Sequence, residues 1–223
     1  MNIILGGKKM NNKKSKISLV LIISSILILT FASIAYSGDY TSSDPNKNSF
    51  FDRGLAYIYA WEWYDSYNTE KYYEAIGNDC TNFVSQVLVE GGMPTYSIAY
   101  YEDINGWRPH SGTWENAHYF RQYWGNVNNV GNNKAYSYKI FTKTTALADF
   151  YNNFYLPLYT GDMIQYGDTN GTTQHSQVIF NYDSYGNISV AQHTSNNIYD
   201  LENYLNSTSY YYVFRYQIQN GDD

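Results

Sequence analysis

Residues 77–86 read Gly-Asn-Asp-Cys-Thr-Asn-Phe-Val-Ser-Gln, and this stretch sets a cysteine at the start of a helix. Asn78 and Asp79 are good helix N-cap residues, and apolar residues at helical spacing follow at once. Cys80 is therefore expected in the first turn, where unpaired backbone N–H groups and the helix dipole favour thiolate over thiol. The helix is expected to end at Gly91-Gly92.

Cys80 is the only cysteine in the chain of 223 residues. It cannot form an intramolecular disulfide, so it is buried and inert, paired with another chain, or reactive. The expected position at a helix start favours a reactive thiol.

The first 36 residues have the pattern of a secretory signal. Residues 1–16 contain five lysines and no acidic residue, and residues 17–36 are almost wholly apolar, with small residues at their end. The segment also approaches the length that spans a bilayer, so an uncleaved membrane anchor is the alternative. Either way we expect an extracellular or cell-surface domain that meets the membrane only through this segment.

The charge of the remaining chain excludes two classes of partner. The whole sequence has 14 basic and 20 acidic residues. Removal of residues 1–35 takes away five lysines and no acidic residue, which leaves a net charge of about −11. Nucleic acids and anionic lipid surfaces need basic patches, so neither is expected as a partner. We also expect no cofactor and a monomeric protein.

Beyond the N-terminal segment, residues 37–48 read as a polar linker and residues 49–219 as one folded domain. Helices are expected at residues 50–66, 80–90, 113–124 and 144–151. Strands are expected at residues 163–166, 176–180, 188–191 and 211–216. Helices followed by strands predict an α+β domain with an antiparallel sheet.

A cysteine nucleophile needs a base and a group that orients the base. His175 and His193 lie at the open end of an expected hairpin, and pairing centred on Ser184 would set them opposite each other on one face. One imidazole would then be the base, held by the other or by a neighbouring amide. A shift of one residue in the pairing would put them on opposite faces. For His118, packing or surface exposure is the expected role.

Two other interpretations stay open. The two histidines with Asp162 or Asp183 could bind zinc, although no ligand spacing supports a metal site. Alternatively, the domain is a non-catalytic module whose aromatic surface binds cell-wall glycan or a partner protein. The tryptophans available for such a surface are Trp61, Trp63, Trp107, Trp114 and Trp124.

The chain resembles the putative amidase domain family, a bacterial branch of the papain-like, NlpC/P60-related cysteine hydrolases. The resemblance spans residues 50–216 and is most specific at the Asp-Cys-Thr-Asn-Phe run. The matching stretches are 51–60 (FDRGLAYIYA), 79–86 (DCTNFVSQ), 91–94 (GGMP), 112–114 (GTW), 161–166 (GDMIQY), 175–176 (HS) and 191–194 (AQHT). Many relatives have glycine where Asn78 stands and a second cysteine where Val87 stands, and neither departure removes a catalytic group.

The resemblance implies a papain-like fold, with N-terminal helices packed on a C-terminal antiparallel sheet. It implies that Cys80 is the nucleophile, that His175 is the general base, and that His193 is the polar residue that orients the base. The expected reaction is hydrolysis of an amide bond through an acyl-thioester, with a peptide or peptidoglycan-like substrate. Acyl transfer with the same Cys80 and His175 is the alternative.

Two further residues are candidates for the oxyanion region and the helix start. The backbone N–H of Cys80 would supply one oxyanion-hole donor, and Tyr73 is a candidate for the second. Asp79 is expected to cap the helix in preference to serving as a catalytic acid.

Overall fold

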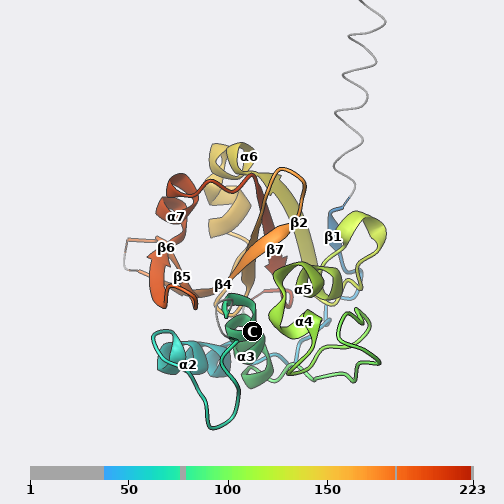
Figure 1. Ribbon diagram of the computed structural model, residues 1–223. Helices are drawn as coiled ribbons and strands as arrows, with labels where there is room; N and C mark the ends of the chain where they lie inside the picture. The colour runs from blue at the N-terminus through green and yellow to red at the C-terminus, as the bar shows by residue number, and fades with distance from the viewer. Residues whose placement is uncertain (1–37, 76–78, 184, 222–223) are drawn as a thin grey trace, which may run out of the picture. The chain divides into compact units, whose positions relative to one another are not determined.

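An antiparallel sheet forms the centre of the domain (Figure 1). The computed structural model describes residues 38–75, 79–183 and 185–221. Within these residues the sheet has seven strands in the order β1-β2-β7-β3-β4-β5-β6. The strands are β1 (Tyr40–Thr41), β2 (Ser137–Thr142), β3 (Met163–Gly167), β4 (Thr173–Tyr182), β5 (Ile188–Gln192), β6 (Asn197–Asp200) and β7 (Tyr212–Gln217).

Helices cover both faces of this sheet (Figure 1), so the predicted α+β class is confirmed. The first helical layer holds α2 (Arg53–Trp63), α3 (Cys80–Glu90), α4 (Gly112–Glu115) and α5 (Ala117–Trp124), followed by the 3-10 helix η1 (Val127–Asn129). The second layer holds α6 (Lys143–Ala148), the π-helix η2 (Tyr151–Tyr155) and α7 (Leu201–Ser207).

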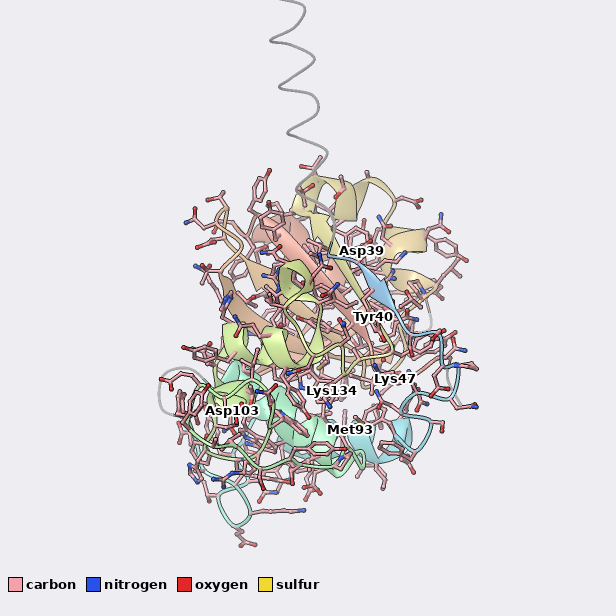
Figure 2. All side chains as sticks on the ribbon, turned by 90° about the vertical axis from the view of Figure 1, so that its right-hand side faces the viewer. Asp39, Tyr40, Lys47, Met93, Asp103 and Lys134 are labelled. Carbon is pink, nitrogen blue, oxygen red and sulfur yellow. The ribbon has the colours of Figure 1, made fainter. Side chains whose placement is uncertain are left out.

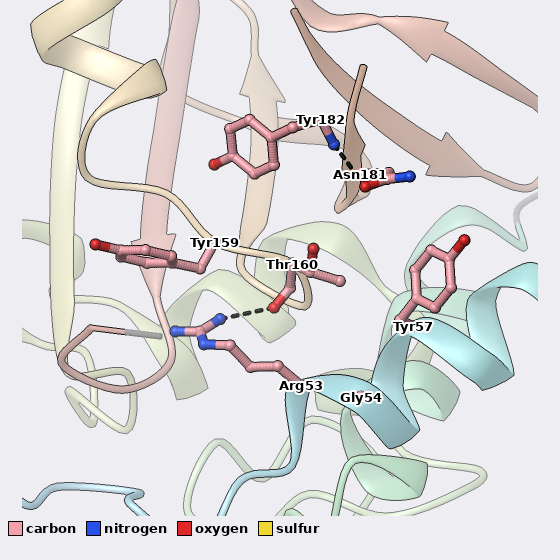
Figure 3. Close-up of a pocket in the computed structure, with 7 residues that line it drawn as sticks. All are labelled: Arg53, Gly54, Tyr57, Tyr159, Thr160, Asn181 and Tyr182. Atoms are coloured by element: carbon pink, nitrogen blue, oxygen red, sulfur yellow. Dashed lines mark hydrogen bonds between the residues drawn. The ribbon is translucent and has the colours of Figure 1, made fainter. Parts of the chain in front are cut away.

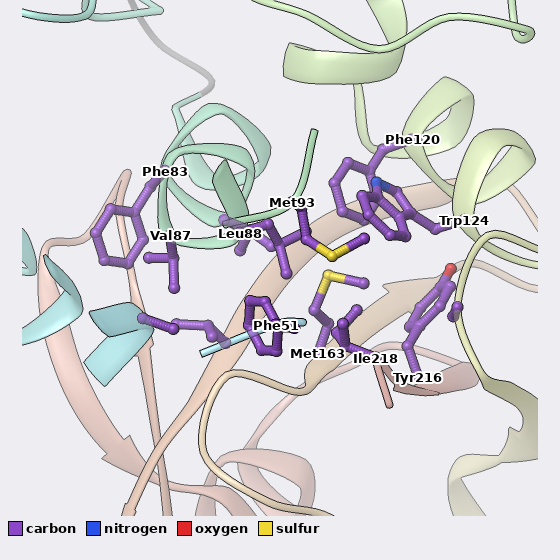
Figure 4. Packing of buried hydrophobic residues seen from close by; sticks show 14 of the residues in the cluster. Phe51, Phe83, Val87, Leu88, Met93, Phe120, Trp124, Met163, Tyr216 and Ile218 are labelled. Atoms are coloured by element: carbon purple, nitrogen blue, oxygen red, sulfur yellow. The ribbon is translucent and has the colours of Figure 1, made fainter. Parts of the chain in front are cut away.

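Successive side chains along each strand lie on opposite faces of the sheet, so the strands contribute to two separate hydrophobic cores. In β3, Met163 lies in the core beneath α2, α3 and α5, whereas the next residue, Ile164, lies in the core beneath α6 and α7. Figure 4 shows the first core, where Phe51 and Met93 from the helical layer meet Met163 and Tyr216 from the sheet. The helical layer that carries Cys80 is thus fixed to the sheet by a continuous apolar contact.

The helix that begins at Cys80 has the predicted bounds and is deeply enclosed. Residues 80–88 are all buried, since α3 packs against α2, α4 and β4. Gly91 follows the last residue, Glu90, and a Cβ there would lie 2.3 Å from the Phe51 ring. Gly92 has φ +96°, a conformation that glycine adopts without steric cost. The glycine pair therefore ends the helix and lets Phe51 approach it.

The predicted helix over residues 113–124 is two helices, α4 and α5. The break falls at Asn116, whose backbone is extended and whose side chain accepts hydrogen bonds from the N–H groups of His118 and Tyr119. Asn116 therefore acts as the N-cap of a new helix, and competition between its side chain and the helical backbone explains the break.

Residues of the predicted linker over 37–48 contribute to the sheet edge. Tyr40 pairs with Tyr138 of β2, and the Lys47 ammonium lies 5.1 Å from the centre of the Tyr40 ring (Figure 2). Asn48 Nδ2 donates to the Ile218 carbonyl at 2.7 Å. The predicted signal or anchor over residues 1–36 lies outside the described residues. In the part of the chain that is described, no helix has the length and apolar character needed to cross a membrane.

A buried ion pair joins the start of α2 to the start of β3. Arg53 Nη1 donates to Asp162 Oδ1 at 3.0 Å. It also donates to the Thr160 carbonyl at 2.7 Å, as Figure 3 shows. Asp162 also accepts from the backbone N–H groups of Ile218 and Tyr159. The Asp162 carboxylate therefore connects three segments of the chain, through its bonds to Arg53, Ile218 and Tyr159.

Replacement of Asp162 by alanine is expected to lower the free energy of unfolding by about 3–5 kcal/mol, because the buried Arg53 guanidinium loses its partner. Denaturant titration followed by tryptophan fluorescence measures the change. Exposed Asp65 offers the matched control, and Asp65→Ala is expected to change the same quantity by less than about 0.5 kcal/mol. Equal midpoints for the two variants would contradict the assignment.

Candidate active site

Cys80 is the first residue of α3, and only 1% of its surface is exposed. The side chain hydrogen-bonds with the His175 imidazole and accepts from the backbone N–H of Ser176. The Thr81 hydroxyl lies 3.7 Å from the Cys80 sulfur and is itself hydrogen-bonded to the Ser176 hydroxyl at 2.9 Å. The sulfur is therefore surrounded by polar partners from α3 and β4.

The pKa values of Cys80 and His175 are shifted in opposite directions. Burial alone would raise the pKa of the thiol, but the hydrogen bond and the charge of His175 outweigh it and hold the pKa below the ordinary value of 9.0. Burial alone would lower the pKa of His175, but its bonds to Cys80 and Gln192 raise the pKa above 6.5. Both shifts favour a thiolate beside an imidazolium.

The imidazole of His175 is oriented by a side-chain amide on the neighbouring strand. His175 Nε2 lies 2.7 Å from Gln192 Oε1, an acceptor, so Nε2 carries the proton in this bond. Nδ1 is then the ring nitrogen that remains for the thiol of Cys80. This arrangement gives the neutral imidazole the tautomer that can accept a proton from sulfur.

A chain of polar side chains fixes the amide of Gln192 in turn. Gln192 Oε1 also accepts from Gln177 Nε2 at 2.5 Å, and Gln192 Nε2 donates to the Ser195 hydroxyl at 2.5 Å. The Tyr166 hydroxyl donates to Gln177 Oε1. Because each amide end faces a partner of the opposite kind, the oxygen of Gln192 is the atom that faces His175.

Tyrosine rings pack around the imidazole on the side of the second core. The rings of Tyr166, Tyr204 and Tyr210 lie with their centres 6.0, 6.1 and 6.4 Å from the centre of the His175 ring. Burial raises the pKa of Tyr204 and Tyr210, and the negative charge of a Cys80 thiolate adds to the shift. Both tyrosines therefore border the imidazole of His175 and sense the charge of the thiolate.

His193 does not orient His175, so this part of the sequence prediction is wrong. Both nitrogens of His193 are engaged elsewhere: Nδ1 lies 2.5 Å from Asp79 Oδ2, and Nε2 lies 2.7 Å from the Trp63 carbonyl oxygen. The side chain that bonds the His175 imidazole is that of its neighbour, Gln192.

The reason is the register of the β4–β5 hairpin. Val178 pairs with Ala191, and the pairing shifts by one residue between Ile179 and Asn181. Next to the turn, Tyr182 pairs with Ile188, two positions from the predicted pairing centred on Ser184, and the bulge leaves the pairs beyond it one position away. A shift of one residue reverses the face of every side chain, so Gln192 shares the face of His175 and His193 points the other way.

Asp79 occupies the N-cap position of α3, but its side chain makes no capping hydrogen bond. Its Oδ1 instead accepts from the Ala75 N–H and from Asn82 Nδ2, both at 2.7 Å, while Oδ2 bonds His193. The predicted capping contact is therefore replaced by a buried polar cluster.

The remaining candidates from the sequence are Tyr73 and the alternative zinc ligands. The Tyr73 ring stacks on the ring of His110 at 4.0 Å, and its carbonyl accepts from Asn82 Nδ2. An oxyanion role for Tyr73 stays a prediction. The alternative zinc set is not assembled, because Asp162 pairs with Arg53 and the described residues contain no group of three or more metal-ligating side chains.

Sequence reasoning missed Gln192, Gln177 and the two bordering tyrosines. Alternation was the available signal for Gln192, since Val190 and Gln192 lie two residues apart and Val190 is buried in the core behind His175. Tyr204 comes from α7, a helix that the sequence did not predict. The bordering tyrosines were therefore not identifiable from motifs alone.

One comparison with known proteins gives a match. A family model described as a putative amidase domain matches residues 50–216, a range that contains Cys80, His175 and Gln192. The comparisons with curated proteins and with solved structures give no match.

Proposed function

The chain belongs to the putative amidase domain family, and on this basis we propose that it is a cysteine amidohydrolase with Cys80 as nucleophile and His175 as base. Membership of the family indicates an amidase-type activity on C–N bonds. The hydrogen-bonded pair of Cys80 and His175, with opposed pKa shifts, carries the proposal of a cysteine mechanism. A thiol at a helix start, beside a cationic imidazole, is the environment that activates cysteine.

The first half of the reaction forms an acyl-enzyme. Nδ1 of His175 takes the thiol proton, and the Cys80 sulfur forms a bond to the amide carbonyl carbon. The carbonyl oxygen becomes an oxyanion beside the first turn of α3, where the helix dipole favours negative charge and the backbone N–H of Cys80 is the proposed donor. The C–N bond then breaks, and the His175 imidazolium gives its proton to the departing amine.

The second half releases the acid. His175 takes a proton from a water molecule, whose oxygen attacks the thioester carbonyl. The C–S bond breaks, the carboxylic acid leaves and loses its proton to solvent, and the imidazolium proton of His175 returns to the sulfur. Acyl transfer would differ only in this half, because an amine or alcohol would replace water.

The arrangement also supports the proposal of a papain-like fold. The nucleophile begins a helix that packs on an antiparallel sheet, the base lies on one strand of that sheet, and its orienting side chain lies on the next strand. In this proposal Gln192 is the orienting group, since it fixes the tautomer and plane of His175 in the way that triads require.

Replacement of Gln192 by alanine is expected to lower kcat by about 10- to 100-fold, because the imidazole loses the acceptor that fixes its tautomer. Gln192→Glu is the informative companion, since it keeps an acceptor oxygen for His175 Nε2. We expect it to retain more activity than the alanine variant when both are assayed on the same amide. Equal losses would argue against orientation as the role of Gln192.

We propose that the substrate is an amide bond in cell-wall peptide. We also propose that the protein is exported. The basic and apolar N-terminal pattern supports export. The absence of a basic surplus in the remaining sequence fits a peptide substrate better than nucleic acid.

Mass spectrometry of purified cell-wall fragments incubated with the protein tests this function. We expect a new amine and a new carboxylate at one bond, with the same protein pre-treated with iodoacetamide as the matched control. A new amine with an acyl group on a second fragment would identify acyl transfer instead. Identical digests with treated and untreated protein would overturn the proposal.

A further inference from the structure

The pair of Asp79 and His193 is buried beside the nucleophile, yet the proposed reaction does not use it. The side chains are 4% and 1% exposed, and the Nδ1–Oδ2 distance is 2.5 Å. The His193 ring stacks on Phe83 of α3 at 4.0 Å between centres, and Tyr67 packs edge-on at 4.9 Å. Burial of two ionisable groups costs free energy unless they are well hydrogen-bonded, so we expect this pair to have a role in the protein.

Hydrogen-bond chemistry limits what His193 can do. The Trp63 carbonyl oxygen can only accept, so His193 Nε2 must carry a proton. The bond between Nδ1 and Asp79 Oδ2 occupies the other ring nitrogen. With both nitrogens occupied, His193 is not available to take a proton from Cys80.

The pair ties the chain segment that carries Cys80 to the segment that carries Gln192, the side chain that bonds His175. Asp79 directly precedes Cys80, and His193 directly follows Gln192, the residue that holds His175. The contact between Asp79 and His193 therefore fixes the start of α3 against the end of β5. The other oxygen of Asp79 extends the cluster to Ala75 and Asn82.

We propose that Asp79 and His193 are positioning residues that hold the Cys80 sulfur within hydrogen-bond reach of His175. The inference rests on the proposed role of Cys80 as nucleophile. The pair acts through Cys80 and does not touch the reacting bond. A displacement of about 1 Å between reacting groups can lower a rate by about 10²-fold. Loss of this contact is therefore expected to lower the reaction rate of Cys80 measurably.

The test is the alkylation rate of Cys80 by iodoacetamide in the full chain, with thiolate absorbance at 240 nm as the second readout. Asp79→Ala and His193→Ala are each expected to lower the rate at pH 7 by about 10²-fold and to diminish the thiolate band. The double variant is expected to react no more slowly than either single variant, because the two residues act as a unit.

Asp79→Asn separates position from charge. Its Oδ1 can still accept from Ala75 and Asn82, while its Nδ2 can donate to Nδ1 of a neutral His193 that keeps its proton on Nε2. Every hydrogen bond is preserved, so we expect the rate and the thiolate band to stay close to those of the unmodified protein. Losses as large as those of Asp79→Ala would overturn the positioning role.

Asp162→Ala is the matched control for general destabilisation, since Asp162 is also a buried, ion-paired carboxylate. It precedes β3 at the opposite end from Tyr166, which pairs with His175. Folded Asp162→Ala is expected to keep the alkylation rate. Unchanged rates in the folded Asp79→Ala and His193→Ala variants would overturn the inference alone. An unreactive Cys80 in the unmodified protein would overturn the proposed function itself.

Discussion

Replacement of Cys80 by alanine is expected to abolish amide hydrolysis, with kcat lower by about 10⁶-fold, the size of loss seen when a catalytic nucleophile is removed. The acyl-thioester cannot form without the sulfur, and the sequence has no other cysteine to replace it. The measurement is the rate at which a cell-wall peptide fragment releases its amine, followed by derivatisation of the new amino group.

Cys80→Ser keeps the size and the hydrogen-bonding capacity of the side chain, and it serves as the matched variant. A hydroxyl is a far weaker acid than a thiol, so His175 cannot hold it as an anion, and we expect nearly the same loss. Thermal melting of both variants checks that the buried position still packs. Turnover within tenfold of the unmodified protein in either folded variant would refute the nucleophile assignment, because removal of a catalytic nucleophile is expected to cost far more, about 10⁶-fold.

Replacement of His175 by alanine is expected to lower kcat by about 10⁴-fold, since both proton transfers lose their carrier. It is also expected to raise the pKa of Cys80. In the unmodified protein, His175 holds that pKa below 9.0 against the effect of burial. Without the imidazole, burial is left as the main influence, and the pKa rises above its ordinary value.

The pH dependence of alkylation by iodoacetamide measures this shift, because only the thiolate reacts. The unmodified protein is expected to reach half of its plateau rate below pH 9, and His175→Ala is expected to reach it only above pH 9. His118→Ala is the matched histidine control, since His118 lies half-buried on α5 and accepts from the Thr173 N–H. Superimposable profiles for the two alanine variants would exclude His175 as the group that lowers the pKa of Cys80.

Local signals in the sequence were sufficient for the part of the site that lies on α3. The polar residues before Cys80 and the Gly91-Gly92 pair predicted both ends of the helix, because helix ends are encoded by neighbours in sequence. His175 was found for a similar reason, since a strand pattern begins beside it. These positions depend on short-range chemistry, which can be read from a single chain.

The features that the sequence did not predict depend on contacts between residues far apart in the chain. The exchange of Gln192 for His193 depends on a bulge in β4, and no motif in residues 176–192 marks the extra residue. Strand β2 pairs with β7, which lies far along the chain, and it was not predicted from its own weak alternation. The contact of Asp79 with His193 joins residues 114 positions apart.

The burial of Cys80 also bears on how the thiol survives outside a reducing compartment. Exchange with a disulfide passes through a mixed disulfide, so both sulfurs must come into bonding contact. With 1% of its surface exposed, Cys80 is shielded from disulfides carried by other proteins. Small peroxides need far less room to reach the sulfur, and a thiolate is the form that they oxidise to sulfenic acid. If the chain is exported as proposed, its working lifetime depends on peroxide and much less on the surrounding disulfide pool.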